Sequence, residues 1–366
     1  MKDFQLRNDT LLLFRNDPFA DLRKLAERKR VLFVYGGGSV KASGCYDDVC
    51  ESVRASGGKL FECGGASREL ADIERGIVLA RENGADLVIG AGGASVMDCA
   101  KLVALGALHE ASVWDYVKGR KSPYGEAKLP LVLIPTYPSS GSEYGLGAVA
   151  ADGRTGEFGT AFGIPADVAL LVPAYSLSLS SEMTAYAGLV TLVQLSASTI
   201  GDENPVSYGV GVSVIRSVLQ AARRLREAPL DLDARGTILC GAALSTSGRL
   251  GLGKESNYAY DLYELEFIPE VLFGVPYRTS LTTVFPRFLK AMARYHEDDV
   301  KAYFKDAFGF EGDVADSSEK LVGLFEDLGV DMRFDGEATL EAVSGILVDS
   351  SLSSEEIHAL IAECCR

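Results

Sequence analysis

Two glycine-rich stretches carry the residue types and spacing that bind phosphate. Each follows an apolar run and leads into a helical pattern. Glycine lets a backbone approach a phosphate closely, and the helix N-terminus that follows supplies unpaired N–H groups and partial positive charge. A tight strand-to-helix turn needs the same glycines, but two such loops in one sheet favour phosphate binding. The candidate residues are Gly37, Gly38 and Ser39 in YGGGSVKASG, and Gly92, Gly93, Ser95 and Asp98 in GAGGASVMDCAK.

A third stretch, PTYPSSGSE, concentrates hydroxyl groups immediately after another apolar run. Thr136 and Ser140 are its candidate ligand-binding residues. Open α/β sheets bind their ligands at the carboxyl ends of the strands, where this stretch would lie. A turn rich in serine and proline is the structural alternative. Asp98 also has a structural alternative, because an aspartate in the first turn of a helix interacts favourably with the helix dipole.

The elements that must position these loops are short apolar strands separated by helical segments. Continuous apolar strands without alternation are typical of a parallel sheet covered on both faces. After about residue 175 strand-like runs cease and amphipathic helical patterns take over. We therefore expect an α/β Rossmann-like domain over 1–175 and an all-helical domain over 176–366. The expected strands are 30–35, 59–64, 85–93, 129–136 and 167–173.

The composition restricts the partners and the compartment. The net charge of −15 argues against binding to nucleic acid or to an anionic membrane surface, which depends on clustered Lys and Arg. The charged start MKDFQLRNDT does not resemble a secretion signal, and no apolar run reaches the about 18 residues of a membrane span. Seven scattered cysteines without a CxxC pair indicate reduced thiols. We expect a cytoplasmic protein that acts on a small molecule.

In order and spacing, the three loops resemble those of the iron-containing (group III) alcohol dehydrogenases, in particular the NADP-dependent butanol dehydrogenase branch. YGGGSVKASGCYDDV and GGASVMDCAK match that branch nearly residue by residue. The resemblance implies a dehydroquinate synthase-like fold. It places Gly37, Gly38 and Ser39 near an adenosine 2′-phosphate, and the second loop at the pyrophosphate and its flank. It also brings Thr136 and Ser140 to the ribose and nicotinamide. NADP is favoured over NAD because the first loop lacks an aspartate that would repel a 2′-phosphate.

The resemblance also implies a metal held by one aspartate and three histidines, and here the chain departs from the family. An ungapped alignment places Val190 and Gln194 at the first ligand pair and Tyr263 and Tyr277 at the second. A further family histidine falls on Phe267. Valine has no ligand atom, and an amide is a poor ligand for iron or zinc. We therefore expect no metal.

Other features of the sequence agree with a lost metal site. The chain has only three histidines, at 109, 296 and 358, and none lies in these segments. Asp261, Glu264 and Glu266 could supply oxygen ligands but lack a recognisable spacing. The family's Asp-Pro is Val172-Pro173 here, and its hairpin lysine is replaced by Glu157 or Phe158.

Three functions stay open at the level of sequence. The first is an NADP-dependent alcohol dehydrogenase or aldehyde reductase in which Tyr263 or Tyr277 donates to the substrate oxygen in place of a metal. The second is a catalytically inactive nucleotide-binding pseudoenzyme with a regulatory or scaffolding role, and the third is a different ligand. For the two tyrosines, the structural alternative is ordinary cavity filling. The resemblance also makes a homodimer a candidate assembly.

Overall fold

The computed structural model describes all 366 residues, and its internal contacts divide the chain into two compact units. The α/β unit comprises Arg7–Leu179 and Ala242–Ser247. The helical unit comprises Met1–Leu6, Ser180–Gly241 and Gly248–Arg366. An α/β unit followed by an all-helical one is the fold class that the sequence predicted. Two short segments cross the division, so each unit contains a piece of chain from the other half of the sequence.

A six-stranded parallel sheet forms the centre of the α/β unit, in the order β1-β8-β5-β4-β2-β3. Its three central strands, β2, β4 and β5, are almost entirely buried, which explains their unbroken apolar sequences. All five expected strands are present. The sixth, β1, was not expected from the sequence. The strands are β1 (Leu11–Phe14), β2 (Arg30–Tyr35), β3 (Lys59–Cys63), β4 (Leu87–Gly92), β5 (Leu131–Pro135) and β8 (Val168–Leu171).

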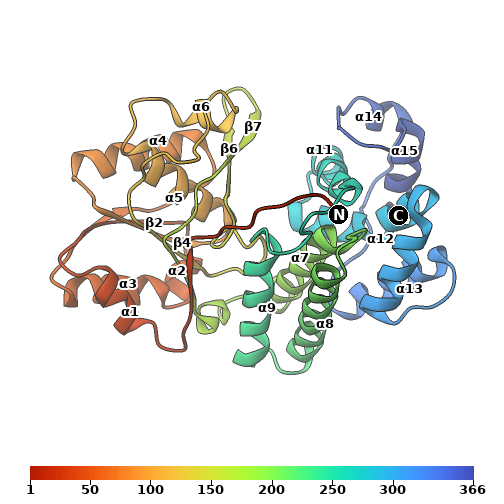
Figure 1. The fold of residues 1–366 in the computed structure, drawn as a ribbon, viewed down its shortest axis with the longest axis horizontal. Helices are drawn as coiled ribbons and strands as arrows, with labels where there is room; N and C mark the ends of the chain where they lie inside the picture. The colour runs from red at the N-terminus through yellow and green to blue at the C-terminus, as the bar shows by residue number, and fades with distance from the viewer. The chain divides into compact units, whose positions relative to one another are not determined.

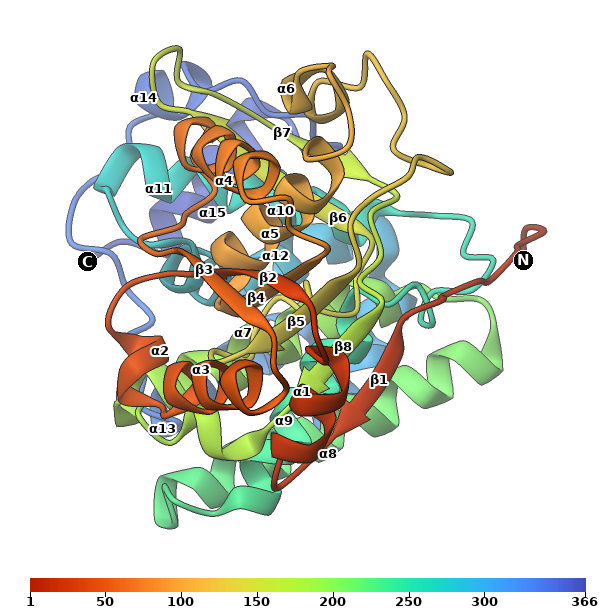
Figure 2. The same cartoon turned by 90° about the vertical axis from the view of Figure 1, so that its left-hand side faces the viewer.

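Helices cover both faces of this sheet (Figures 1 and 2). One apolar core joins the sheet to α4, α5 and α6, and a second core joins its other face to α1, α2 and α3. The helix α5 is buried along nearly its whole length. The helices are α1 (Phe19–Leu25), α2 (Ser39–Ala42), α3 (Cys45–Ala55), α4 (Leu70–Glu82), α5 (Ala94–Gly106) and α6 (Val113–Val117).

A separate antiparallel hairpin lies beside α5 and α6, formed by β6 (Gly147–Asp152) and β7 (Glu157–Phe162). One face of β6 is buried through alternate residues, whereas β7 is largely exposed. The hairpin continues directly from the PTYPSSGSE loop, so it ties that loop to α5.

The helical unit is built around α7 and α12. α7 is buried on all sides, packing against α8 and α12, and α12 also contacts α13 and α15. Serine and asparagine side chains cap α7 and α8, and a capping box starts α15. The helices are α7 (Ser181–Thr199), α8 (Pro205–Glu227), α9 (Leu232–Ser245), α10 (Leu262–Leu265), α11 (Phe267–Phe273), α12 (Tyr277–Tyr303), α13 (Val314–Asp327), α14 (Leu340–Ser344) and α15 (Ser354–Glu363).

Short 3-10 turns complete the helical elements at Pro173–Ser176 and Tyr258–Asp261, and a π turn follows at Phe304–Phe308. No helix combines the length and the apolar character that crossing a membrane requires.

Candidate nucleotide loops and a tyrosine cluster

The three candidate loops meet at one edge of the parallel sheet. β2, β4 and β5 are consecutive neighbours, and each loop follows the carboxyl end of one of them. The backbone N–H of Thr136 donates to the carbonyl of Gly92 at 3.0 Å, joining the second and third loops directly. The fold therefore brings together the stretches that carry the nine predicted cofactor residues.

The glycines of these loops have two distinct uses. A Cβ atom on Gly37 or Gly38 would meet nothing within 4 Å, so these residues leave open space beside the backbone. A Cβ on Gly90 would lie 2.5 Å from the Cβ of Ala100, so this glycine allows α5 to pack closely on β4. Gly93 is the N-cap of α5, which has no side-chain cap and no acidic residue in its first turn, so Asp98 lies beyond the turn in which the sequence placed it. Such a helix start can accept an anion.

Asp98 is buried on α5, and both of its carboxylate oxygens have donors from the protein. Oδ1 accepts from the hydroxyl of Ser142 at 2.5 Å, and Oδ2 accepts from the backbone N–H of Val149 at 3.1 Å. The side chain is 7% exposed. The structure thus places Asp98 behind the third loop, bonded to that loop and to the hairpin strand β6.

Lys101 lies one helical turn further along α5 and is fully buried. Its ammonium donates to the carbonyls of Gly145 at 2.9 Å and Gly147 at 2.7 Å. Burial lowers the pKa of Lys101 to about 8, although the nearby carboxylates of Asp98 and Glu143 oppose that shift. The same face of α5 therefore holds both ends of the segment between the third loop and β6.

Glu143 adds a second carboxyl group to this interior. Its side chain is 1% exposed, and its Oε1 atom has no hydrogen-bond partner. Burial raises the pKa of Glu143 to about 7, partly offset by its own backbone N–H and by Lys101. The raised pKas of Glu143 and Asp98 and the lowered pKa of Lys101 have the same main cause, which is removal from water.

The third loop also contacts the C-terminal end of α9, in addition to its bonds to α5. Gly141 has φ +65°, and a Cβ there would lie 2.0 Å from the carbonyl oxygen of Ala242. The hydroxyl of Thr246 donates to the carbonyls of Ser140 at 3.1 Å and Gly141 at 2.9 Å. Only glycine fits at position 141, and this close approach explains why Ala242–Ser247 belongs to the α/β unit.

The two candidate catalytic tyrosines belong to a second cluster, in the helical unit. Val190 and Gln194 are four residues apart on α7, so they share one face of that helix. The side-chain amide of Gln194 donates to the hydroxyl of Tyr277 at 3.2 Å. The charge of an ionised Tyr277 would in turn raise the pKa of Tyr263. Two of the four positions aligned with family metal ligands, Gln194 and Tyr277, are thus linked by a hydrogen bond.

Both tyrosines are held in the protonated form. Burial is the main cause of the raised pKa of each phenol, and the charge of Glu266 contributes to both. The Tyr263 ring stacks on Tyr260, with the centroids 5.9 Å apart. Phe267, aligned with another family histidine, begins α11. No group of three or more His, Cys, Asp or Glu side chains is arranged to hold a metal ion.

Sequence reasoning did not single out Ser142, Lys101 and Glu143. All three lay inside the quoted motifs, as SGSE and MDCAK. The three-residue spacing of Asp98 and Lys101 could have indicated a shared helix face. Their burial could not have been found in this way, because it depends on β6 covering that face of α5.

Comparisons with known proteins agree with this architecture. The family model "Iron-containing alcohol dehydrogenase" matches residues 10–173. Probable NADH-dependent butanol dehydrogenase 2 of Bacillus subtilis is 28% identical over 375 residues, covering 99% of this chain and 92% of the relative. NADPH-dependent aldehyde reductase YqhD of Escherichia coli is 26% identical over 298 residues, covering 78% of this chain and 75% of the relative.

Solved structures extend the likeness to the whole chain. NADH-dependent butanol dehydrogenase A of Thermotoga maritima superimposes with a TM-score of 0.88 at 23% identity, covering 100% of this chain and 99% of that one. The Escherichia coli YqhD structure gives a TM-score of 0.85 at 20% identity, covering 99% of each chain. These matches confirm the dehydroquinate synthase-like fold class that the sequence predicted.

Proposed function

Because the chain belongs to the iron-containing alcohol dehydrogenase family, we propose that it is an NADP-dependent oxidoreductase of small alcohols or aldehydes that works without the family's metal. The observation that carries this proposal is the bond from Gln194 to Tyr277, at the positions aligned with metal ligands. A hydroxyl that accepts a hydrogen bond keeps its own proton available. The phenol can therefore donate to a substrate oxygen.

NADP is favoured by the open first loop. Gly37 and Gly38 leave room beside the backbone, and the loop contains no carboxylate that would repel a 2′-phosphate. Lys41 lies on the short helix that follows, with its ammonium 4.9 Å from the ring centroid of Tyr46. A cation close to this loop favours the additional phosphate. The relatives are named as NADH- or NADPH-dependent, so a dinucleotide is the cofactor class in either case.

The side chains at the metal positions do not fit the family's iron. Val190 has no ligand atom, and Gln194 offers only a neutral amide. Tyr263 and Tyr277 would have to lose protons that their raised pKas retain. First-row metals in proteins instead select imidazole, thiolate or carboxylate. We therefore derive no catalytic step through a metal.

In the proposed reduction, Tyr277 orients the substrate carbonyl and polarises it by hydrogen bonding. When bound, NADPH would supply the hydride to the carbonyl carbon, and the proton for the oxygen would come from the Tyr277 hydroxyl, which water then reprotonates. Gln194 fixes the direction of the Tyr277 hydroxyl, and the hydroxyl of Tyr263 is the candidate for a second donor. Preorganised neutral donors stabilise the charge that develops on the oxygen without first being ionised.

A pseudoenzyme is the alternative, and the raised pKas of both phenols favour it. A phenol that holds its proton so strongly is a poor general acid at neutral pH. In that case the nucleotide loops would bind NADP while the tyrosine cluster only fills the space left by the metal ligands. The protein would then serve a regulatory or scaffolding role.

NADPH oxidation measured against a panel of aldehydes separates these functions. For the reductase we expect turnover that neither a chelator nor added Fe²⁺ or Zn²⁺ changes. Tyr277→Phe should lower kcat about 10²-fold, the scale of one positioned donor. Tyr208→Phe is the matched control, because this tyrosine lies in the same unit and bonds to Asp306. It should leave kcat unchanged.

Each alternative has its own result in this assay. Nucleotide binding without turnover on any aldehyde would support the pseudoenzyme. Turnover that rises with added metal would overturn the claim that the metal site is lost. Failure of the wild-type chain to bind any dinucleotide would leave a different ligand as the explanation of the loops.

A further inference from the structure

We propose that Asp98 and Lys101 form a paired anchor on α5 that holds the segment Thr136–Gly147 in its cofactor-binding conformation. Asp98 is then a positioning residue and not a group that contacts the cofactor. This inference rests on the proposed function, because it assigns a role within the dinucleotide loops. It changes the role expected for Asp98 and adds Lys101 and Ser142, which the sequence reasoning did not select.

The hydrogen bonds of Asp98 are the first observation that supports the anchor. Its two oxygens accept from Ser142 at 2.5 Å and from the Val149 backbone at 3.1 Å, so each oxygen already has a donor. The side chain is buried behind the loop. A group that contacted a phosphate or a sugar would need an oxygen accessible to that ligand, and a carboxylate would also repel a phosphate. Bonds to two separate parts of the chain are what an anchor requires.

The hydrogen bonds of Lys101 are the second observation that supports the anchor. Its ammonium is buried and donates to two backbone carbonyls, at Gly145 and Gly147. Those carbonyls bracket the point where the third loop becomes strand β6. Asp98 and Lys101 lie three residues apart, so one face of α5 makes three bonds to this segment and a fourth to Val149 of β6. Burying these charged groups is costly unless they are hydrogen-bonded, and here each makes two hydrogen bonds.

The conformation of the segment depends on bonds to other parts of the chain, such as those from Asn8 to the carbonyl of Tyr144 and from Gly163 and Ile164 to the carbonyl of Leu146. It contains no regular secondary structure between Pro135 and Gly147, and Thr136 and Ser140 must be positioned from within it. On its other side, Thr246 bonds to the carbonyls of Ser140 and Gly141. The loop is thus held between α5 and the end of α9. A shift of about 1 Å in a positioning group is enough to weaken a productive geometry.

A double-mutant cycle between Asp98 and Ser142 tests the anchor. The variants are Asp98→Asn, Ser142→Ala and the double variant, with Thr10→Val as the matched control. Thr10 is a buried hydroxyl in the same unit that donates to the carbonyl of Ala166 at 2.8 Å. Three quantities are measured: the melting temperature, the Kd of NADPH from its fluorescence, and the hydrogen exchange of amides 136–147 without nucleotide.

For the anchor, we expect Ser142→Ala to raise the Kd of NADPH about fivefold to tenfold, the scale of one buried hydrogen bond. Asp98→Asn should raise it at least as much, and the double variant should be no worse than Asp98→Asn. All three should speed exchange at 136–147. Thr10→Val should lower the melting temperature without changing the Kd or the exchange of this loop.

Two results would overturn the proposal. One is an Asp98→Asn variant with weakened NADPH binding beside a Ser142→Ala variant that binds as the wild type does, because Asp98 would then contact the cofactor itself. The other is unchanged exchange at 136–147 in both variants. If the wild type bound no dinucleotide, the proposed function would fail instead, and the nucleotide-free exchange would still decide whether the anchor exists.

Discussion

At the residue scale, Glu143 shows how burial sets the chemistry of a side chain. An exposed glutamate ionises near pH 4.5, whereas the pKa of Glu143 is raised to about 7 in the folded chain, chiefly by burial. Between these values the folded state binds more protons than the unfolded state. The free energy of unfolding contributed by this group therefore falls as the pH rises from 4.5 to about 7. Lys101, with a pKa lowered to about 8, titrates above that window.

Glu143→Gln should remove this dependence, since an amide stays neutral at every pH. At pH 5 the variant and the wild type should have similar stability. At pH 7.5 the variant should be more stable by about 1–3 kcal/mol, the free-energy scale of a pKa shift of this size. Urea unfolding across this range measures the difference. Parallel stability curves for the two proteins would show that Glu143 ionises normally and is not buried as described.

The residues of the tyrosine cluster could be named from the sequence because an alignment shows directly that the family's metal ligands are replaced there. Val190, Gln194, Tyr263 and Tyr277 occupy aligned positions, and no small shift of alignment could create a histidine there. The bond between Gln194 and Tyr277 was not predictable, because it joins residues 83 positions apart on two helices. The same reason hid the anchoring role of Asp98, whose partners lie 44 and 51 positions away.

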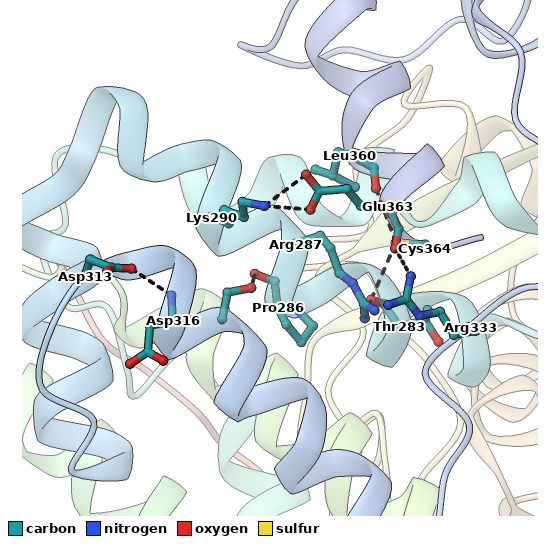
Figure 3. A network of polar contacts seen from close by, with 11 residues as sticks. Thr283, Pro286, Arg287, Lys290, Asp313, Asp316, Arg333, Leu360, Glu363 and Cys364 are labelled. Atoms are coloured by element: carbon teal, nitrogen blue, oxygen red, sulfur yellow. Dashed lines mark hydrogen bonds and ion pairs between the residues drawn. The ribbon is translucent and has the colours of Figure 1, made fainter. Parts of the chain in front are cut away.

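At the element scale, α12 contains a buried proline, and the neighbouring helix α13 bonds to the carbonyl of that same residue. Pro286 cannot donate to the carbonyl of Thr282 within the helix. The buried hydroxyl of Ser318 on α13 donates to the Pro286 carbonyl at 2.8 Å, and Arg287 donates to the carbonyl of Thr283 at 3.1 Å. Figure 3 shows Thr283, Pro286 and Arg287 together with the Lys290–Glu363 pair, which joins α12 to α15.

Ser318→Ala should therefore destabilise the protein by about 1–2 kcal/mol, because a buried carbonyl loses a donor that water cannot replace. Ser213→Ala is the control, since this exposed serine on α8 bonds only to a carbonyl of its own helix. Its effect should stay within about 0.5 kcal/mol. Chemical denaturation of both variants gives the comparison. Equal stabilities for Ser318→Ala and the wild type would mean that the bond between α12 and α13 contributes nothing.

The elements that sequence patterns predicted are those with a strong period or a long apolar run. β2, β4 and β5 are buried on both faces, and their sequences are apolar throughout. β1 was missed because it is four residues long and lies at the edge of the sheet. β6 was missed because its sequence, GAVAAD, has no alternation of apolar and polar residues. Buried and partly exposed residues alternate along this strand only because α5 covers one of its faces.

At the scale of the whole molecule, two chain segments join the unit opposite to their place in the sequence. The backbone N–H of Lys2 donates to the carbonyl of Gly253 at 2.7 Å, which holds Met1–Leu6 in the helical unit. A Cβ on Gly253 would lie 2.5 Å from the Lys2 carbonyl oxygen. Such exchanges depend on contacts between distant residues, so a boundary placed by a change in sequence pattern cannot find them.

The family resemblance also predicts that two copies of the chain form a homodimer. The two edge strands of the parallel sheet indicate where the copies would meet. β1 is an edge strand with Leu11 56% and Phe14 42% exposed, whereas the opposite edge, β3, exposes no large apolar side chain. An open edge with apolar residues is a template for pairing with a second chain.

We expect sedimentation equilibrium to give twice the chain mass of 39.1 kDa. Leu11→Lys should shift the protein to the single-chain mass, because pairing would bury the new charge. Val78→Lys, which changes an exposed valine on α4, should leave the dimer intact. A wild type at the single-chain mass would exclude the dimer, and a dimeric Leu11→Lys variant would place the interface elsewhere.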